Sequence, residues 1–140
     1  MVPKRQTKAV GYVRVATVCG AQSEEQLQRH KNTIIARCLD SRIELTHMIV
    51  DIGGRQGRGR ALDLLVMERA AVLVVPSLAQ LARKTAELAP ILGHYFRAPS
   101  GVADLIAVAD SIDTRTKQGR MAIDLVCCVA RFEAGSVYHA

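Results

Sequence analysis

The chain has 140 residues, enough for one domain with a hydrophobic core but too few for two ordinary domains. Its hydrophobic fraction of 49% and charged fraction of 23% are those of a folded globular protein and exclude wholesale disorder. The net charge of +6 favours polyanions such as nucleic acid, although a solvated basic surface gives the same balance.

Neither a membrane span nor a secretory signal is predicted. No apolar run approaches the roughly 18 residues that a span needs, and the start, MVPKRQTK, has no apolar core. We therefore expect a cytoplasmic protein without membrane contact. The histidines are scattered and the cysteines fit no zinc spacing, so we expect no metal, no cofactor and reduced thiols at Cys19, Cys38, Cys127 and Cys128.

Strand and helix patterns alternate in the first part of the chain. Residues 9–15 (AVGYVRV) are rich in β-branched side chains and predict a strand. Residues 23–38 predict a helix that starts with a capping box of Ser23 and Gln26. Residues 48–51 form a short apolar run that predicts a second strand. Apolar side chains at helical spacing predict an inward face of Leu27, Ile34, Ile35 and Cys38.

The middle of the chain contains a glycine-rich basic segment. Residues 53–60 (GGRQGRGR) hold four glycines and three arginines and predict a flexible loop. The next elements are predicted as a helix over 61–70, a buried strand over 71–75, a helix over 78–92 and a buried strand over 103–109. Leu62, Leu65 and Val66 are expected to face inward, and Pro90 to end or kink its helix.

This order predicts an α/β fold, a mostly parallel sheet of four to five strands with helices on both faces. Functional sites in such sheets lie at the carboxyl ends of the strands. The segments predicted to meet there are 14–20, 51–60, 76–83 and 110–120.

The helix predicted over 121–132 (MAIDLVCCVARF) is apolar around most of its circumference. One sheet covers only one stripe of a helix, so a second partner is expected. Another subunit is favoured over a position between the sheet and the loops of the same domain. The predicted interface residues are Met121, Ile123, Leu125, Val126, Val129 and Phe132.

Two segments resemble the catalytic domain of serine recombinases, the resolvase and invertase family. Residues 12–17 (YVRVAT) resemble the family's Tyr-x-Arg-Val-Ser-Thr motif. Residues 113–121 (DTRTKQGRM) resemble its Asp-Thr-x-Thr-x-x-Gly-Arg-Met entry to a long dimerisation helix. Residues 62–65 and 72–83 lie where the family has its second helix and a strand leading to Leu-Asp-Arg-Leu-Gly-Arg, so the resemblance covers nearly the whole chain.

The resemblance implies a specific chemistry. In this family a serine hydroxyl attacks a DNA phosphodiester, arginines neutralise the transition state, and no metal or nucleotide is needed. It also implies a resolvase-like fold that ends in a dimerisation helix, with a basic tail over 1–8, the α/β domain over 9–118, and the helix and tail over 119–140. No appended DNA-binding domain is expected.

The family's site residues carry over unevenly. Tyr12, Arg14, Asp51 and Arg83 match the motifs, but the nucleophilic serine is Ala16 in this chain. The aspartate and first arginine of Leu-Asp-Arg-Leu-Gly-Arg are Ala79 and Gln80, and its glycine is Ala82. The arginine expected three positions before Leu62 is Gly59. A methyl group has no lone pair with which to form a covalent intermediate, so the site is predicted to be degenerate.

Two neighbours of Ala16 carry nucleophilic atoms, the Thr17 hydroxyl and the Cys19 thiol. Either would make the chain an active strand-exchange enzyme with an unorthodox nucleophile, which is the less favoured interpretation. Arg14 has an alternative structural role, an ion pair with Asp51. The arginines predicted to reach DNA phosphates are Arg14, Arg55, Arg58, Arg60, Arg83 and Arg120. For Arg55, Arg58 and Arg60 the alternative is a solvated mobile loop.

The sequence therefore predicts a serine-recombinase-like domain that has lost its nucleophile and acts by binding. We expect a homo-oligomer formed through the last helix, a protein partner on the same surface, or weak non-specific DNA binding, with a regulatory role. A small electrostatic DNA-binding module remains a further alternative.

Overall fold

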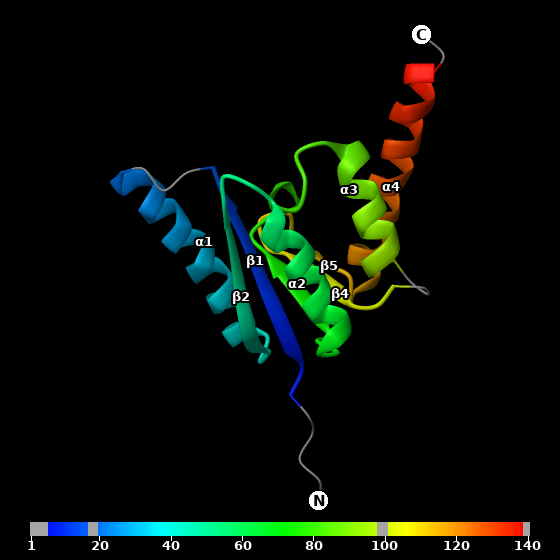
Figure 1. Ribbon diagram of the computed structural model, residues 1–140. Helices are drawn as coiled ribbons and strands as arrows, with labels where there is room; N and C mark the ends of the chain where they lie inside the picture. The colour runs from blue at the N-terminus through cyan, green and yellow to red at the C-terminus, as the bar shows by residue number, and fades with distance from the viewer. Residues whose placement is uncertain (1–5, 17–19, 98–100, 139–140) are drawn as a thin grey trace, which may run out of the picture.

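The computed structural model describes residues 6–16, 20–97 and 101–138, with side-chain exposure described to residue 133 (Figure 1). None of the described helices is both long enough and apolar enough to cross a bilayer. The strands are β1 (Lys8–Val15), β2 (Glu44–Ile52), β3 (Val72–Val75), β4 (Asp104–Ala107) and β5 (Ile112–Asp113). The helices are α1 (Ala21–Asp40), α2 (Gln56–Met67), η1 (Leu78–Gln80), α3 (Thr85–Ile91), η2 (Leu92–Phe96) and α4 (Lys117–Tyr138).

One five-stranded sheet in the order β2-β1-β3-β4-β5 forms the centre of the molecule. The first three neighbouring pairs are parallel, and β4 pairs with β5 antiparallel. The predicted α/β class and mostly parallel sheet are confirmed. Strand β5 was not predicted, because two residues are too few to give a periodic pattern. Its antiparallel course returns the chain to the amino ends of the parallel strands.

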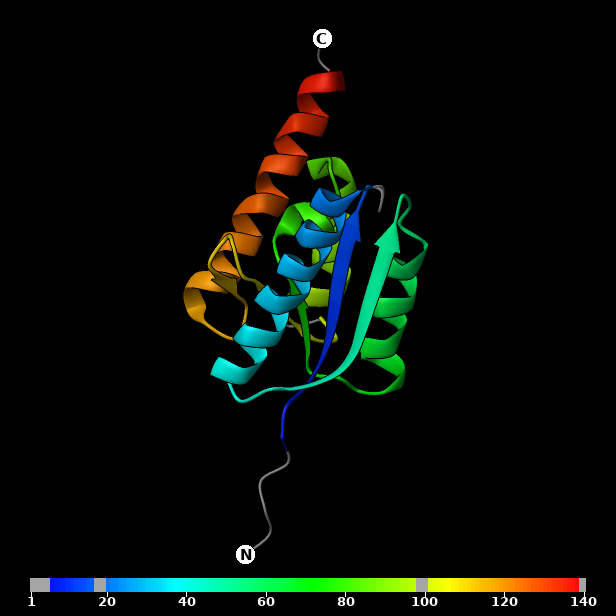
Figure 2. The same ribbon diagram turned by 90° about the vertical axis from the view of Figure 1, so that its left-hand side faces the viewer.

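Helices cover both faces of the sheet, as predicted. Helix α1 lies on one face, while α2, α3 and α4 lie on the other (Figures 1 and 2). The alternation of side chains along β1 divides the core accordingly: Val13 packs with α1, and Val10 and Tyr12 pack on the opposite face. Strand β3 is fully buried, as expected of a strand covered on both faces.

Helix α1 begins earlier than predicted. Gly20, the residue directly before the helix, has a φ of +94°. Glycine adopts this backbone conformation without steric cost, so the chain turns there. Ser23 lies inside the first turn, and the predicted capping box is wrong. Ile34 and Cys38 are buried as predicted, but Ile35 is 41% exposed. Cys38, Cys127 and Cys128 are free thiols, and burial raises the pKa of Cys38.

The glycine-rich segment is not a loop throughout, which corrects the prediction. Helix α2 starts at Gln56 because the Asp51 carboxylate accepts hydrogen bonds from the N–H groups of Gly57 (2.7 Å) and Arg58 (3.1 Å). The first N–H groups of a helix lack the carbonyl four residues earlier, and a carboxylate five residues before the helix accepts from these two, although Arg58 N–H also donates to the carbonyl of Arg55 at 3.2 Å. Val66, predicted to face inward, is 53% exposed.

The segment predicted as one helix over 78–92 is divided. A single 3-10 turn, η1, is followed by α3, which contains Pro90 and continues as the π-helical turn η2. Proline has no N–H to donate to the carbonyl four residues earlier, and the chain adopts the wider turn directly after it. The α-helix therefore ends one residue after Pro90, as predicted, and the chain continues as the π-helical turn η2.

Candidate functional site

The carboxyl edge of the sheet brings together the ends of β1 and β2 and the segment after β3. The Arg14 N–H donates to Gln80 Oε1 at 2.5 Å, which attaches β1 to η1. Ala16 follows β1 directly and is exposed. Tyr12, Arg14, Ala16, Asp51 and Gln80 are thus gathered at one edge, as the predicted strand order required. Thr17 and Cys19 lie outside the described residues.

The side chain of Arg14 contacts backbone carbonyls. Its Nε donates to the oxygen of Gly54 at 3.1 Å, and its Nη2 donates to that of Gly53 at 3.4 Å. Arg14 and Asp51 are register partners in neighbouring strands, but their side chains form no ion pair. The predicted Arg14–Asp51 pair is therefore wrong. The Asp51 carboxylate instead accepts hydrogen bonds from the Tyr12 hydroxyl and the first N–H groups of α2, while the Arg14 guanidinium donates to the carbonyls of Gly53 and Gly54.

Tyr12 and Asp51 form a buried hydrogen bond, in which the phenolic hydroxyl donates to Asp51 Oδ2 at 2.6 Å. The same carboxylate accepts the first N–H groups of α2, so all three donors converge on one side chain. Burial, followed by the hydrogen bond to Asp51, raises the pKa of Tyr12 well above its usual value. The pair joins β1, β2 and α2 at the base of the site.

Arg55 and Arg58 attach the start of α2 to the segment after β3. Arg55 Nη1 donates to the carbonyl of Gln80 at 2.5 Å, and Arg58 Nη1 donates to the carbonyl of Leu81 at 2.6 Å. Arg58 also pairs with Glu87 Oε1 at 2.8 Å, a hydrogen bond that lowers the pKa of Glu87. Arg55 and Arg58 therefore hold two segments of the fold together, and the alternative that they belong to a solvated mobile loop is wrong.

Two further arginines of the predicted set lie exposed near this edge. Arg60 on α2 and Arg83 before α3 have no hydrogen-bond or ion-pair partner among the described residues. Ala79, which replaces the family's aspartate, is also exposed. Ala16 and Ala79 thus expose methyl groups where the family motifs carry a hydroxyl and a carboxylate.

Arg120 lies at the opposite end of the sheet, so its predicted place in the site is wrong. It lines a cavity of about 320 Å³ together with Ala71 and Asp104, which lie at the amino ends of β3 and β4. Its Nη1 donates to the carbonyls of Thr114 and Arg115, both at 3.3 Å. The return of the chain along β5 causes this displacement, because residues after 113 come back to the amino edge.

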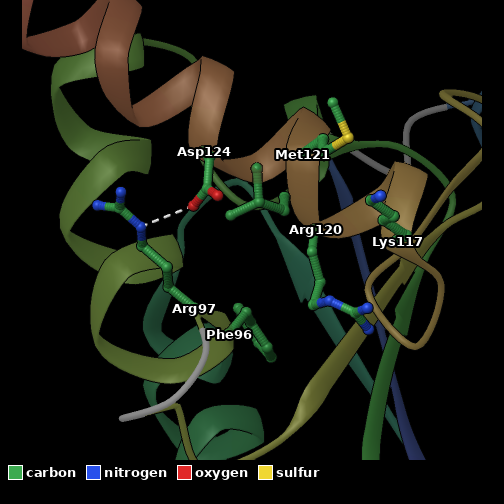
Figure 3. A pocket seen from close by; sticks show the side chains of 7 residues that line it. Phe96, Arg97, Lys117, Arg120, Met121 and Asp124 are labelled. Atoms are coloured by element: carbon green, nitrogen blue, oxygen red, sulfur yellow. Dashed lines mark hydrogen bonds and ion pairs between the residues drawn. The ribbon is translucent and has the colours of Figure 1, made fainter.

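A second cavity, of about 390 Å³, adjoins Arg120 at the start of α4. Figure 3 shows Lys117 and Met121 above Phe96, and the ion pair between Arg97 Nε and Asp124 Oδ1 at 2.8 Å. One acidic and three basic side chains line it, so its charge is positive. The described part of the chain has no group of three His, Cys, Asp or Glu side chains placed to hold a metal ion.

Helix α4 has two different apolar sides. Ile123, Cys127 and Ala130 are buried against the chain's own core, so Ile123 is unavailable as the interface residue that was predicted. Val126 is partly buried against the same core. The remaining predicted interface residues stay exposed, by 61% for Met121, 65% for Leu125, 43% for Val129 and 77% for Phe132.

Two contributors were missed by the sequence analysis. Asp110 Oδ2 accepts the N–H of Leu78 at 2.7 Å and so fixes the start of η1, and Glu87 holds Arg58. Asp110 and Glu87 are single acidic residues that belong to no motif in the sequence. Their partners lie 32 and 29 residues away, a separation at which only the fold reveals a contact.

Comparison with known proteins identifies the family. The profile described as "Resolvase, N terminal domain" matches residues 9–138. No curated protein sequence matches closely enough to count as a relative. The N-terminal catalytic domain of TP901-1 integrase is similar in structure, with a TM-score of 0.82 at 18% identity over 94% of this chain and 99% of that chain.

Two other solved structures are similar. A resolvase family site-specific recombinase from Streptococcus pneumoniae gives a TM-score of 0.78 at 22% identity, covering 95% of this chain and 91% of that chain. The C-terminal catalytic domain of ISC1926 TnpA, an IS607-like serine recombinase, gives a TM-score of 0.52 at 18% identity, covering 93% of this chain and 84% of that chain. These likenesses show the fold, and the profile match shows the family: the chain belongs to the resolvase N-terminal domain family of serine recombinases.

Proposed function

We propose that this domain does not cleave DNA and acts by association, with other copies or another protein, beside DNA that it binds weakly. One observation carries the proposal. Ala16, at the position where the family motif has its nucleophilic serine, is exposed at the end of β1 and presents a methyl group there. A methyl group cannot form a phosphoester bond.

The surroundings of Ala16 support the same conclusion. Arg55 and Arg58 donate to the carbonyls of Gln80 and Leu81, and Gln80 itself accepts the N–H of Arg14. A guanidinium already bound to carbonyl oxygens must give up those bonds to stabilise a phosphoryl transition state. Preorganised charge is the main source of such stabilisation, and here the charge is oriented toward the protein.

Weak DNA binding is supported by the exposed Arg60 and Arg83. Cations of this kind contact phosphates without reading sequence, and their contribution decreases steeply as salt rises. We expect retention on DNA or heparin at low salt that is lost at moderate salt. Absence of retention even at low salt would remove DNA binding from the proposal.

Association is supported by the outward side of α4. Met121, Leu125 and Val129 follow one another at intervals of four residues, so they share one stripe of the helix, and each is at least 43% exposed. A contiguous apolar stripe on a helix whose other side is already packed indicates a protein partner. A regulatory role follows if that partner is an active recombinase subunit.

Two measurements on one preparation test the proposal. Incubation with supercoiled DNA, followed by denaturing separation, detects protein joined covalently to a DNA end, and we expect none. An adduct mapped to Thr17 or Cys19 would establish the alternative, an active enzyme with an unorthodox nucleophile. Light scattering across a dilution series measures mass, and a strict monomer that binds no recombinase subunit would contradict association.

A further inference from the structure

Strand β2 forms one edge of the sheet, and none of the described residues pairs with its outer side. Figure 2 shows this edge, with α1 in front of the sheet and α2 behind it. A bulge at Thr46, opposite the step from Ala9 to Val10, leaves a regular stretch from His47 to Ile52. The Gly53 N–H donates to the carbonyl of Val15 in β1. Because N–H groups along a strand alternate between its two sides, those of Met48, Val50 and Ile52 point away from β1, toward the open edge.

This edge has few of the features that normally prevent strand pairing. The sequence of β2, ELTHMIVDI, contains no proline and no lysine, and no Asp, Glu, Lys or Arg lies between Glu44 and Asp51. Exposed edges in natural proteins are usually protected by such residues, by short length or by a covering element. A nine-residue edge without them, with Met48, Ile49 and Val50 in succession, indicates that a partner covers it.

Helix α1 presents apolar side chains on the flank nearest this edge. Arg37 on α1 reaches Asp113 of β5, at the far edge of the sheet, with 3.3 Å between the charged atoms. Ile35 and Leu39 are two residues away from Arg37 on either side, so they lie on the opposite flank, toward β2. Leu39 is 74% exposed and Ile35 is 41% exposed.

Helix α2 also presents apolar side chains near the β2 edge, on the other face of the sheet. Gly57 lies so close to Ile49 and Asp51 that an added Cβ would meet their side chains, and Gly57 and Arg60 line a hollow along β2. Leu64 and Met67 continue this stripe at spacings of four and three residues. Met67 is 78% exposed, so this stripe, which also carries the charged Arg60, ends in an exposed apolar side chain.

We propose that the β2 edge is a homotypic interface, at which β2 of a second copy pairs antiparallel and extends the sheet across a two-fold axis. The axis lies perpendicular to the sheet, so α1 faces its partner's α1 and α2 faces its partner's α2. Each helix contacts both β1 and β2. With strands about 4.8 Å apart, like helices come to about 10 to 14 Å, a gap that leucine and methionine side chains fill.

A second copy fits better than an isolated peptide strand. A peptide would satisfy the outward N–H groups of β2 but would bring no helices to cover Leu39 and Met67 on opposite faces. The contact surface is about 30 Å long and about 20 Å deep, the scale of the roughly 800 Å² per partner in stable dimers. This inference is independent of the α4 surface, and two isologous interfaces together generate a closed tetramer or an open array.

The test separates the two surfaces by substitution and measures mass by sedimentation equilibrium. Leu125→Lys disables the α4 stripe, and we expect this variant to remain a dimer through β2. Adding Leu39→Lys and Met67→Lys, both at exposed positions, is expected to give a monomer. Val66→Lys, also exposed but on another flank of α2, is the matched control and is expected to leave the dimer intact.

Hydrogen exchange tests whether strands pair. In the Leu125→Lys variant, the amides of Met48, Val50 and Ile52 should exchange about tenfold more slowly at about 100 µM than at about 1 µM protein. A monomeric Leu125→Lys protein, or equal exchange at both concentrations, would overturn this inference while leaving the proposed function standing. A double Leu39→Lys, Met67→Lys variant that is monomeric supports the β2 interface and contradicts self-association through α4.

Discussion

Tyr12 and Asp51, which are 39 residues apart in the sequence, share a buried hydrogen bond of 2.6 Å at the base of the degenerate site. Asp51 also holds the first turn of α2 through Gly57 and Arg58. Residues that the family resemblance places in a catalytic site therefore have a second role in this chain, the connection of β1, β2 and α2. This role explains how part of the motif persists beside Ala16.

Replacing Tyr12 by phenylalanine removes one donor from a buried carboxylate. We expect a loss of about 1.5 to 3 kcal/mol in the free energy of unfolding, measured by urea denaturation at pH 7. The raised pKa of Tyr12 adds a pH dependence, because only the unfolded tyrosine ionises near its usual pKa. The advantage of the wild type should therefore shrink above about pH 10. Tyr95→Phe is the control, and an equal loss there would contradict the assignment.

Arg115 and Asp113 form an ion pair at 2.7 Å at the turn before α4. Burial raises the pKa of Asp113, but the hydrogen bonds from Arg115 and the charges of Arg115 and Arg37 outweigh this effect and lower it. A lowered folded-state pKa stabilises the protein above the unfolded value, about 3.9, and the benefit is lost as pH falls through the folded value.

Arg115→Gln should therefore cost about 1 kcal/mol at pH 7, a modest figure because Arg115 is partly exposed to solvent. The cost should approach zero once the pH falls below the lowered pKa of Asp113, because this carboxyl is then protonated in both proteins. Denaturation curves over a series of falling pH values measure it, with Arg29→Gln as the exposed control. A cost that is independent of pH would show that the ion pair is not responsible.

Restoring the hydroxyl by Ala16→Ser should not restore DNA cleavage. Ala79 and Gln80 still replace two groups of the family motif, and each missing charge-stabilising group costs about 2.7 to 4 kcal/mol in barrier. Nicking of supercoiled plasmid measures the result, and the triple variant Ala16→Ser, Ala79→Asp, Gln80→Arg is the positive comparison. Efficient nicking by the single variant would refute this prediction.

Gly119 occupies a position in α4 that admits no side chain. A Cβ there would lie 1.9 Å from the carbonyl oxygen of Asp113, so backbone must move to accommodate alanine. We expect Gly119→Ala to lower the free energy of unfolding by about 3 kcal/mol or more. Gly59→Ala on α2 meets nothing within 4 Å and should instead stabilise by about 0.5 to 1 kcal/mol. Thermal denaturation measures both variants. Equal changes in melting temperature for Gly119→Ala and Gly59→Ala would contradict the close packing of α4 against the turn at β5.

Leu125→Lys places a charge on the exposed side of α4 without touching the core. If α4 associates with a partner, affinity should fall by about 30-fold or more, the effect of losing a central apolar contact. Ile123→Ala, on the buried side, should instead cost about 2 to 5 kcal/mol of stability. Unchanged affinity in Leu125→Lys, measured by titration against the partner or by dilution of a protein that also carries Leu39→Lys and Met67→Lys, would exclude α4 as the interface.

The strand and helix patterns predicted the fold class because they are local. The buried runs at 71–75 and 103–109 correspond to β3 and β4, and a repeating order of strand and helix permits few sheet topologies. Boundaries that depend on distant groups were not predictable. Helix α2 starts at Gln56 only because Asp51 caps it, and the composition of the glycine-rich segment contains no sign of that contact.

The sequence by itself determined that side chain 16 carries no oxygen and that α4 is apolar on more than one side. Only the tertiary structure decided which cations remain exposed: Arg55 and Arg58 are bound to carbonyls, Arg60 and Arg83 are exposed, and Arg120 lies at the other end of the sheet. The physical reason is that composition fixes which atoms exist. Hydrogen-bond partners and burial depend on contacts between residues far apart in the chain, which form only when the chain folds.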